Sequence, residues 1–220
     1  MGFGRFGFLL LALVFFLVTT PFAEHTPAAE VRFQILFSLV LVVGVYTMSS
    51  RQSMIRAAVL ALVAFATGAV HTVDEGIVST QVAYATSIAF LGYVTFVVLS
   101  AVLQERRVTT DTIFGGICVY FLIGLIWTLL YALVLAFDPE ALQAGGQPVS
   151  YELERGSSVL LYFSFVTLTT LGYGDVAPVS DVARMLAGGE AVFGQLFIAI
   201  LIARLVGMHI STTHLRRHED

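Results

Sequence analysis

Residues 167–175 read Thr-Leu-Thr-Thr-Leu-Gly-Tyr-Gly-Asp, and this run decides what the rest of the chain must build around it. Between Thr170 and Gly174, the main-chain carbonyls can all face one axis if alternate residues adopt mirror-image backbone geometry. Glycine reaches positive φ without a steric penalty, so Gly172 and Gly174 stand where such a ladder needs them. A helix-length apolar segment flanks the run on each side, which argues against a chance glycine-rich turn.

The run resembles the selectivity filter of tetrameric potassium channels, whose usual core is Thr-Val-Gly-Tyr-Gly-Asp; this chain departs from that core at Leu171. The resemblance implies four copies around one axis, with stacked rings of oxygens that replace the hydration shell of K+. It assigns the selectivity filter to Thr170, Leu171, Gly172, Tyr173 and Gly174. K+ is then coordinated at Thr170, Leu171, Gly172 and Tyr173, and no other cofactor is expected.

The composition excludes an ordinary soluble domain. Hydrophobic residues make up 58% of the 220 residues and charged residues only 12%. The single cysteine, Cys118, excludes an intrachain disulfide. The net charge of −4 comes with no basic face, so nothing indicates a nucleic-acid partner.

Apolar segments of membrane-spanning length recur along the chain. A bilayer core of about 30 Å needs roughly 20 apolar residues per helix, and six segments qualify: 3–20, 31–48, 54–70, 82–103, 112–137 and 181–208. A seventh, 157–169, rises only about 20 Å as a helix and should enter and return as a pore helix. The predicted fold class is an all-α membrane protein, with six transmembrane helices, a re-entrant pore helix and a filter loop, assembled as a tetramer.

These segments predict three parts. Residues 1–107 form a four-helix transmembrane domain, and residues 108–208 form a pore domain of outer helix, pore helix, filter and inner helix. An acidic loop at 138–156 separates the outer helix from the pore helix. Residues 209–220 form a short cytoplasmic tail.

The arginines predict the orientation, because cytoplasmic flanks carry an excess of basic residues. With both termini in the cytoplasm, eight arginines fall on or near the inner face: Arg5, Arg51, Arg56, Arg106, Arg107, Arg204, Arg216 and Arg217. Arg32, Arg155 and Arg184 fall outside. The expected location is the plasma (inner) membrane, as a multi-pass protein. The first span also resembles a cleaved signal peptide, and the remaining topology is the same in that case.

Three residues are predicted to support the filter. In the potassium channel family, an aromatic donor of the pore helix holds the carboxylate that ends the filter. The spacing gives this role to Tyr162, facing Asp175; a role in packing alone is the alternative. Thr169 is the third, at the end of the pore helix.

Glu190 is an ionisable residue inside an apolar helix, where it is costly unless it has a partner. One interpretation is a structural hydrogen bond to the pore helix or to the hydroxyls of Thr167 or Thr169. The other is a carboxyl group whose protonation is coupled to the state of the filter. Both make Glu190 a filter-support candidate.

Gly194 aligns with the glycine that the family uses as a bending point in the inner helix. A gating hinge is one reason for a helical glycine, and close packing against the pore helix is the other. Beyond it, Ile198, Ile202 and Leu205 or Val206 follow at helical spacing and are candidates for lining the cavity or gate; core packing is the alternative. Arg204 is expected to extend to the cytoplasmic lipid headgroups.

The first four spans resemble the layout of voltage-gated channels but lack the charges. Residues 82–103 contain no charged residue, whereas a voltage sensor needs several arginines there. Only eight residues connect residue 103 to residue 112, so the four helices should pack on the pore helices of their own chain.

The resemblance implies a potassium-selective, passively conducting homotetramer that is not an enzyme and not strongly voltage-gated, with K+ and membrane lipid as partners. One alternative is a weakly selective cation channel, against which the intact Tyr173 argues. Another is a non-conducting regulatory membrane subunit. The sequence leaves the gating stimulus open among protons, lipid, tension and weak voltage dependence.

Overall fold

A computed structural model describes residues 4–23, 29–48, 50–71, 76–105, 108–149 and 158–217. Helices lie over every predicted segment. They are α1 (Arg5–Ala23), α2 (Ala29–Tyr46), α3 (Arg51–His71), α4 (Ile77–Gln104), α5 (Thr110–Phe137), α7 (Val159–Leu168) and α8 (Asp181–Arg217). Among the residues singled out above, Arg106, Arg107, Arg155 and residue 157 lie outside the described ranges.

Four helical segments of the described chain are long and apolar enough to cross a membrane: Arg51–His71, Ile77–Gln104, Thr110–Phe137 and Asp181–Arg204. Shorter apolar helical segments are Arg5–Thr20 in α1, Ile35–Tyr46 in α2 and Val159–Leu168 in α7. The structure is therefore that of a mainly helical membrane protein, and the count of six spans stays a prediction.

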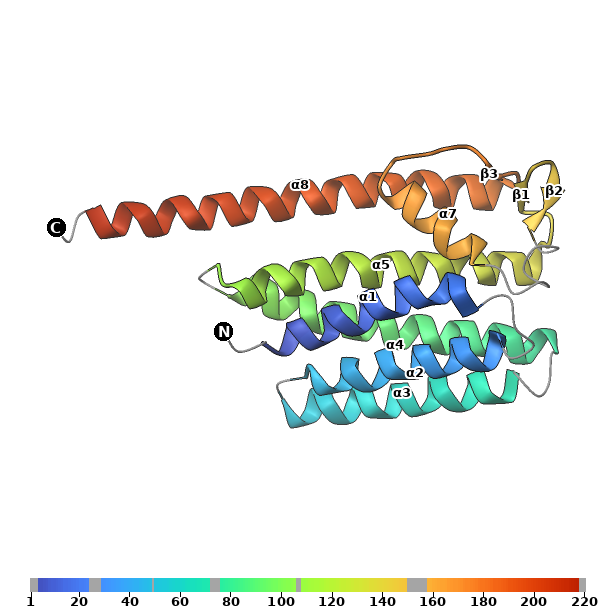
Figure 1. Cartoon of the computed structure of the whole chain (residues 1–220), viewed down its shortest axis with the longest axis horizontal. Helices are drawn as coiled ribbons and strands as arrows, with labels where there is room; N and C mark the ends of the chain where they lie inside the picture. The colour runs from blue at the N-terminus through green and yellow to red at the C-terminus, as the bar shows by residue number, and fades with distance from the viewer. Residues whose placement is uncertain are drawn as a thin grey trace.

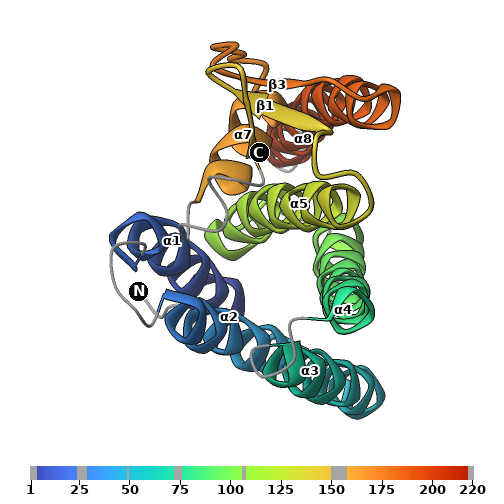
Figure 2. The ribbon, with the colours of Figure 1, turned by 90° about the vertical axis from the view of Figure 1, so that its right-hand side faces the viewer.

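Helix α5 packs against helices that precede it in the chain and against helices that follow it. The helices α1 to α4 pack each on the next, and both α1 and α4 pack against α5, which closes a ring of five helices. On its other side α5 contacts α7 and α8 (Figures 1 and 2). Of the first four helices, α1 and α4 thus lie against α5 of the same chain, and the packing of these helices on their own rather than a neighbouring subunit stays a prediction. Fully buried side chains hold this packing, among them Leu9 and Leu13 of α1, Phe90 and Leu91 of α4, and Val119 and Leu122 of α5.

A small antiparallel sheet lies at one end of α5 and α8. Its strands are β1 (Leu142–Ala144), β2 (Gln147–Pro148) and β3 (Val176–Pro178), in the order β2-β1-β3. Gly145 and Gly146 join β1 to β2 and both have positive φ, 57° and 82°, as a two-residue hairpin turn requires. Strand β3 directly follows Asp175, so the exit of the 167–175 run is paired to the loop that leaves α5.

The sequence predicted an acidic loop in the region of β1 and β2, and the structure adds this small sheet to a chain that is otherwise mainly helical. The Gly-Gly pair is the local signal of the hairpin. The acidic residues of the loop's second half, 152–154, lie outside the described residues.

Helix α8 is longer than the predicted span. It continues past Met208 without a break to Arg217 and extends beyond the ends of the neighbouring helices (Figure 1). The start of α1 and the end of α8 lie at the same end of the molecule, and the strands lie at the opposite end.

Arg204 ties α8 to α4, so the prediction that it reaches lipid headgroups is wrong. Its Nη1 donates to the carbonyl of Val102 at 2.6 Å, and its Nη2 donates to the carbonyls of Leu103 at 2.6 Å and Glu105 at 3.1 Å. The last carbonyls of a helix have no partner within the helix and carry its partial negative charge. A guanidinium supplies hydrogen-bond donors to these carbonyls and a positive charge next to their partial negative charge. These interactions are more favourable for Arg204 than a position at the lipid surface.

We predict that Arg204→Met lowers the stability of the protein in detergent, because the substitution keeps an unbranched apolar stem but removes all three donors. The loss should be roughly 1–3 kcal/mol, the usual value for hydrogen bonds to a charged group. Thermal unfolding measures it. Arg184→Met is the matched control on the same helix, since Arg184 makes an exposed ion pair with Asp181 at 3.9 Å, and such pairs contribute little. Equal shifts in the two variants would contradict the prediction.

Candidate ion-conduction site

The end of α7 sets the conformation in which the 167–175 run begins. The N–H of Thr170 donates to the carbonyl of Thr167 at 2.9 Å, and the N–H of Leu171 donates to the carbonyl of Val166 at 2.9 Å. These two bonds form a Schellman motif, which needs a left-handed residue at the position that Thr170 occupies. Thr170 has φ of 58° and is the one non-glycine residue with positive φ among the described residues.

A β-branched residue in this conformation is a true outlier, because its Cβ comes too close to the following carbonyl. The cost is about 1–2 kcal/mol, which the usual glycine would avoid. Threonine at this position therefore indicates that its side chain is needed.

Positive φ recurs at every second residue of the run. Thr170, Gly172 and Gly174 have φ of 58°, 57° and 78°, while Leu171 and Tyr173 between them do not adopt positive φ. The positive φ predicted at the two glycines is thus present. A Cβ added at Gly172 or Gly174 would meet nothing within 4 Å in the single chain, so the backbone angle alone demands glycine.

Asp175 is held from two sides at the C-terminal end of the run. The Tyr162 hydroxyl donates to its Oδ2 at 2.7 Å, which is the contact that the spacing predicted, and the N–H of Val176 donates to its Oδ1 at 3.1 Å. The hydrogen bond from Tyr162 is the largest influence that lowers the pKa of Asp175 below its usual value. In turn the carboxylate raises the pKa of Tyr162 to about 12. Both groups therefore keep this bond across the physiological pH range.

Gly194 allows α8 to approach the end of α7. A Cβ on Gly194 would lie 2.1 Å from the carbonyl oxygen of Leu168, which no side chain can tolerate. The same carbonyl accepts a hydrogen bond from the Tyr120 hydroxyl of α5 at 3.3 Å. This contact supports the close-packing alternative for Gly194. Helix α8 is unbroken there, so the hinge stays a prediction.

One contact of this region was missed by the sequence analysis. Nε2 of Gln195 donates to Oγ1 of Thr170 at 2.9 Å. The sequence signal for this contact was a single amide side chain, that of Gln195, directly after Gly194 on an otherwise apolar stretch of α8.

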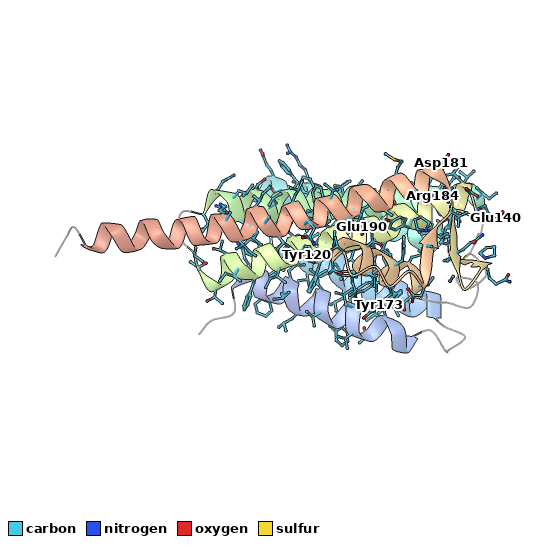
Figure 3. The ribbon with its side chains drawn as sticks, turned by 90° about the horizontal axis from the view of Figure 1, so that it is seen from above. Tyr120, Glu140, Tyr173, Asp181, Arg184 and Glu190 are labelled. Carbon is cyan, nitrogen blue, oxygen red and sulfur yellow. The ribbon has the colours of Figure 1, made fainter. Side chains whose placement is uncertain are left out.

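Glu190 is fully buried between α5, α7 and α8. Its Oε1 accepts from the Ser164 hydroxyl at 2.6 Å and its Oε2 accepts from the Tyr131 hydroxyl at 2.6 Å. Figure 3 shows Glu190 where α8 lies over α5. The partner is therefore the pore helix, as the structural interpretation proposed, and neither Thr167 nor Thr169. Tyr131 was not predicted, since nothing local in the sequence connects it to Glu190.

Among the side chains that the structure describes, those of the remaining predicted residues make no hydrogen bond to another helix. The Thr169 hydroxyl donates back to the carbonyl of Phe165 at 2.7 Å, within its own helix. The side chains of Ile198 and Ile202 are exposed on the single chain. The side chain of Val206 lies outside the described residues. Their assignments as filter support and as cavity or gate lining stay predictions.

Comparison with known proteins places this site in a family. Residues 147–210, which include α7, the 167–175 run and most of α8, match the family described as Ion channel. Protein LctB of Geobacillus stearothermophilus is 31% identical over 131 residues, which cover 54% of this chain and 93% of that relative. This chain belongs to the same family as Protein LctB. It carries an ion channel domain, so the protein is an ion channel and not an enzyme.

Two further relatives extend the comparison. Protein LctB of Bacillus caldotenax is 29% identical over 131 residues, again 93% of its length. Two pore potassium channel a of Oryza sativa subsp. japonica is 33% identical over 86 residues, which are 38% of this chain but only 23% of that relative. The similarity to the rice protein thus concerns a small part of that channel.

We predict that Tyr162→Phe moves the acid sensitivity of ion flux to higher pH. Folding lowers the pKa of Asp175. The charge of Asp175 and its bond to Tyr162 are therefore fully present above the usual aspartate pKa, and they are lost only as the pH falls through the lowered pKa. Without the hydroxyl, Asp175 should take up its proton at higher pH. Flux into liposomes at stepped external pH measures the midpoint. Tyr46→Phe removes an exposed hydroxyl of α2 and should leave it unchanged; an unshifted midpoint in Tyr162→Phe would refute the prediction.

We predict that Glu190→Gln preserves the folded protein and that Glu190→Leu does not. A glutamine oxygen can accept from Tyr131, and its amide can donate to Ser164, which can then donate to the carbonyl of Gly124 that lies 2.8 Å away. Leucine removes the acceptor of the buried Tyr131 hydroxyl, at roughly 1–3 kcal/mol for the group left unsatisfied, whereas Ser164 can still donate to Gly124. Size-exclusion chromatography and thermal unfolding in detergent compare the two variants. Equal stability of both would show that the carboxyl contacts contribute nothing.

Proposed function

We propose that the protein is a potassium-selective channel made of four copies of this chain, which conducts K+ passively and is not strongly voltage-gated. The observation that carries the proposal is the positive φ at Thr170, Gly172 and Gly174 within Thr-Leu-Gly-Tyr-Gly-Asp. Alternating backbone geometry of this kind turns successive carbonyls towards one side. Four such strands around an axis would give stacked oxygen rings.

In this mechanism an ion exchanges its hydration water for carbonyl oxygens and moves in single file. The coordinating residues are Thr170, Leu171, Gly172 and Tyr173. Selectivity requires that the rings keep their geometry when ions pass. The bond between Tyr162 and Asp175 and the pairing of β3 with β1 support this requirement at the outer end.

The relatives support the choice of ion. The rice protein is named a potassium channel, and its similarity to this chain supports K+ as the ion that this protein conducts. The intact Tyr173 favours K+ over a weakly selective filter.

The setting we propose is the plasma (inner) membrane, with both termini in the cytoplasm and the filter near the outer face. The arginine distribution supports it, and so does the position of the start of α1 and the end of α8 at one end of the molecule (Figure 1). Residues 82–103 within α4 contain no charge, so a steep response to voltage is not expected. In this setting, Gly194 would serve as the gating hinge, and Ile198, Ile202 and Val206 would line the inner cavity.

The proposal predicts that purified protein in a planar bilayer, with K+ on one side and Na+ on the other, passes current that reverses near the K+ equilibrium potential. Voltage steps should change the open probability only weakly. A reversal potential near zero would mean a weakly selective cation channel. Absence of current would favour the non-conducting regulatory subunit.

Gly172→Ala should abolish the K+ preference, because alanine resists φ of 57°. The chain offers a matched control in Gly145→Ala, since Gly145 also has φ of 57° and also has nothing within 4 Å of an added Cβ. It lies in the β1–β2 hairpin and should keep selectivity. Equal effects of the two substitutions would mean that general misfolding, and not the filter backbone, causes the loss.

A further inference from the structure

Thr170 keeps a side chain at a position where glycine would remove the strain. Its left-handed conformation is unfavourable for a β-branched residue, and yet the helix end requires that conformation. Strain at one residue of a site is retained where the side chain is used. The contact made by the Thr170 hydroxyl is therefore informative.

That contact comes from α8. Nε2 of Gln195 lies 2.9 Å from Oγ1 of Thr170, across 25 positions of sequence. Its neighbours on the helix, Phe193 and Leu196, are apolar and exposed on the single chain. Gln195 is thus a polar side chain on an apolar segment with a partner in the 167–175 run.

The contact depends on the glycine that precedes Gln195. Because Gly194 has no Cβ, the α8 backbone comes against the carbonyl of Leu168, at the end of the helix that Thr170 terminates. A larger residue would push α8 away and move the amide out of reach of Oγ1. The close helix packing and the contact between Gln195 and Thr170 are thus parts of one arrangement.

The contact has a consequence for ion binding. A threonine hydroxyl has one hydrogen and two lone pairs, and its hydrogen rotates freely unless a partner fixes it. The amide occupies one lone pair and restricts that rotation. With one lone pair held by the amide, the hydrogen and the second lone pair have only two positions left, and the rotamer that turns the hydrogen away from a cation presents the second lone pair to it.

We propose that Gln195 is a positioning residue for the Thr170 hydroxyl, and that it sets the affinity for K+ at the inner end of the filter. This inference rests on the proposed function, in which Thr170 forms the innermost oxygen ring. Gln195 acts through Thr170 and does not itself need to contact the ion.

The test measures K+ binding at equilibrium, without conduction. A ligand that binds only the folded protein raises its melting temperature, because it adds a free energy of RT ln(1 + [L]/Kd) to the stability. Melting of the detergent-solubilised full chain is followed as K+ replaces Na+ at constant ionic strength, for the wild type, Gln195→Leu, Thr170→Val and the double variant. Gln81→Leu in α4 is the control, because it makes the same chemical change away from the filter.

We expect Gln195→Leu to need about threefold to tenfold more K+ for the same stabilisation, as for the loss of one hydrogen bond per chain. Thr170→Val should weaken binding too, and adding Gln195→Leu to it should have no further effect, because the hydroxyl through which Gln195 acts is then gone. Gln81→Leu should match the wild type. If Gln195→Leu fails to assemble, Gln195→Asn keeps the amide but shortens its reach, and it should give the same weakening.

Two results would overturn the inference alone: K+ affinity unchanged in the Gln195 variants, or effects of the two single substitutions that multiply in the double variant. A wild type that K+ stabilises no better than Na+ would remove the proposed selectivity as well. The two failures are therefore distinguishable in one set of melting curves.

Discussion

The close approach of α8 to the carbonyl of Leu168 is the constraint on which the packing of α5, α7 and α8 depends. Three helices meet at this group: α7 ends there, Tyr120 of α5 donates to it, and Gly194 of α8 lies against it. No side chain fits between α8 and this carbonyl. The spacing of α5, α7 and α8 is consequently set by backbone contact, and the backbone that leaves α7 enters the 167–175 run from a fixed position.

The polar groups buried between these helices act in the same direction. Glu190 joins Tyr131 of α5 to Ser164 of α7, and Ser164 also lies within 2.8 Å of the Gly124 carbonyl on α5. Fully buried hydrogen bonds of this kind tolerate little change in the distances between helices. Apolar contacts alone would permit α7 to slide, whereas these bonds fix its register on both neighbours.

The sequence predicted what depends on local chemistry. The helices, the positive φ at Gly172 and Gly174 and the contact of Tyr162 with Asp175 follow from hydropathy, glycine geometry and spacing within one segment. The partners of Glu190, Arg204 and Gln195 could not be predicted with the same precision, because they come from other segments 25 to 102 positions away. Arg204 shows the physical reason: a helix end and a lipid surface both suit an arginine, and only the packing decides between them.

The pairing of β3 with β1 means that the 167–175 run is not a loop with a free end. Its N-terminal end is anchored through α7, and its C-terminal end is anchored through a strand that pairs with the connection leaving α5. Because both ends of this segment are held, the strain in its backbone depends on the distance between the two points of attachment. A tilt of α5 at the end that carries the strands would be transmitted to Asp175 along the sheet, without passing through α8.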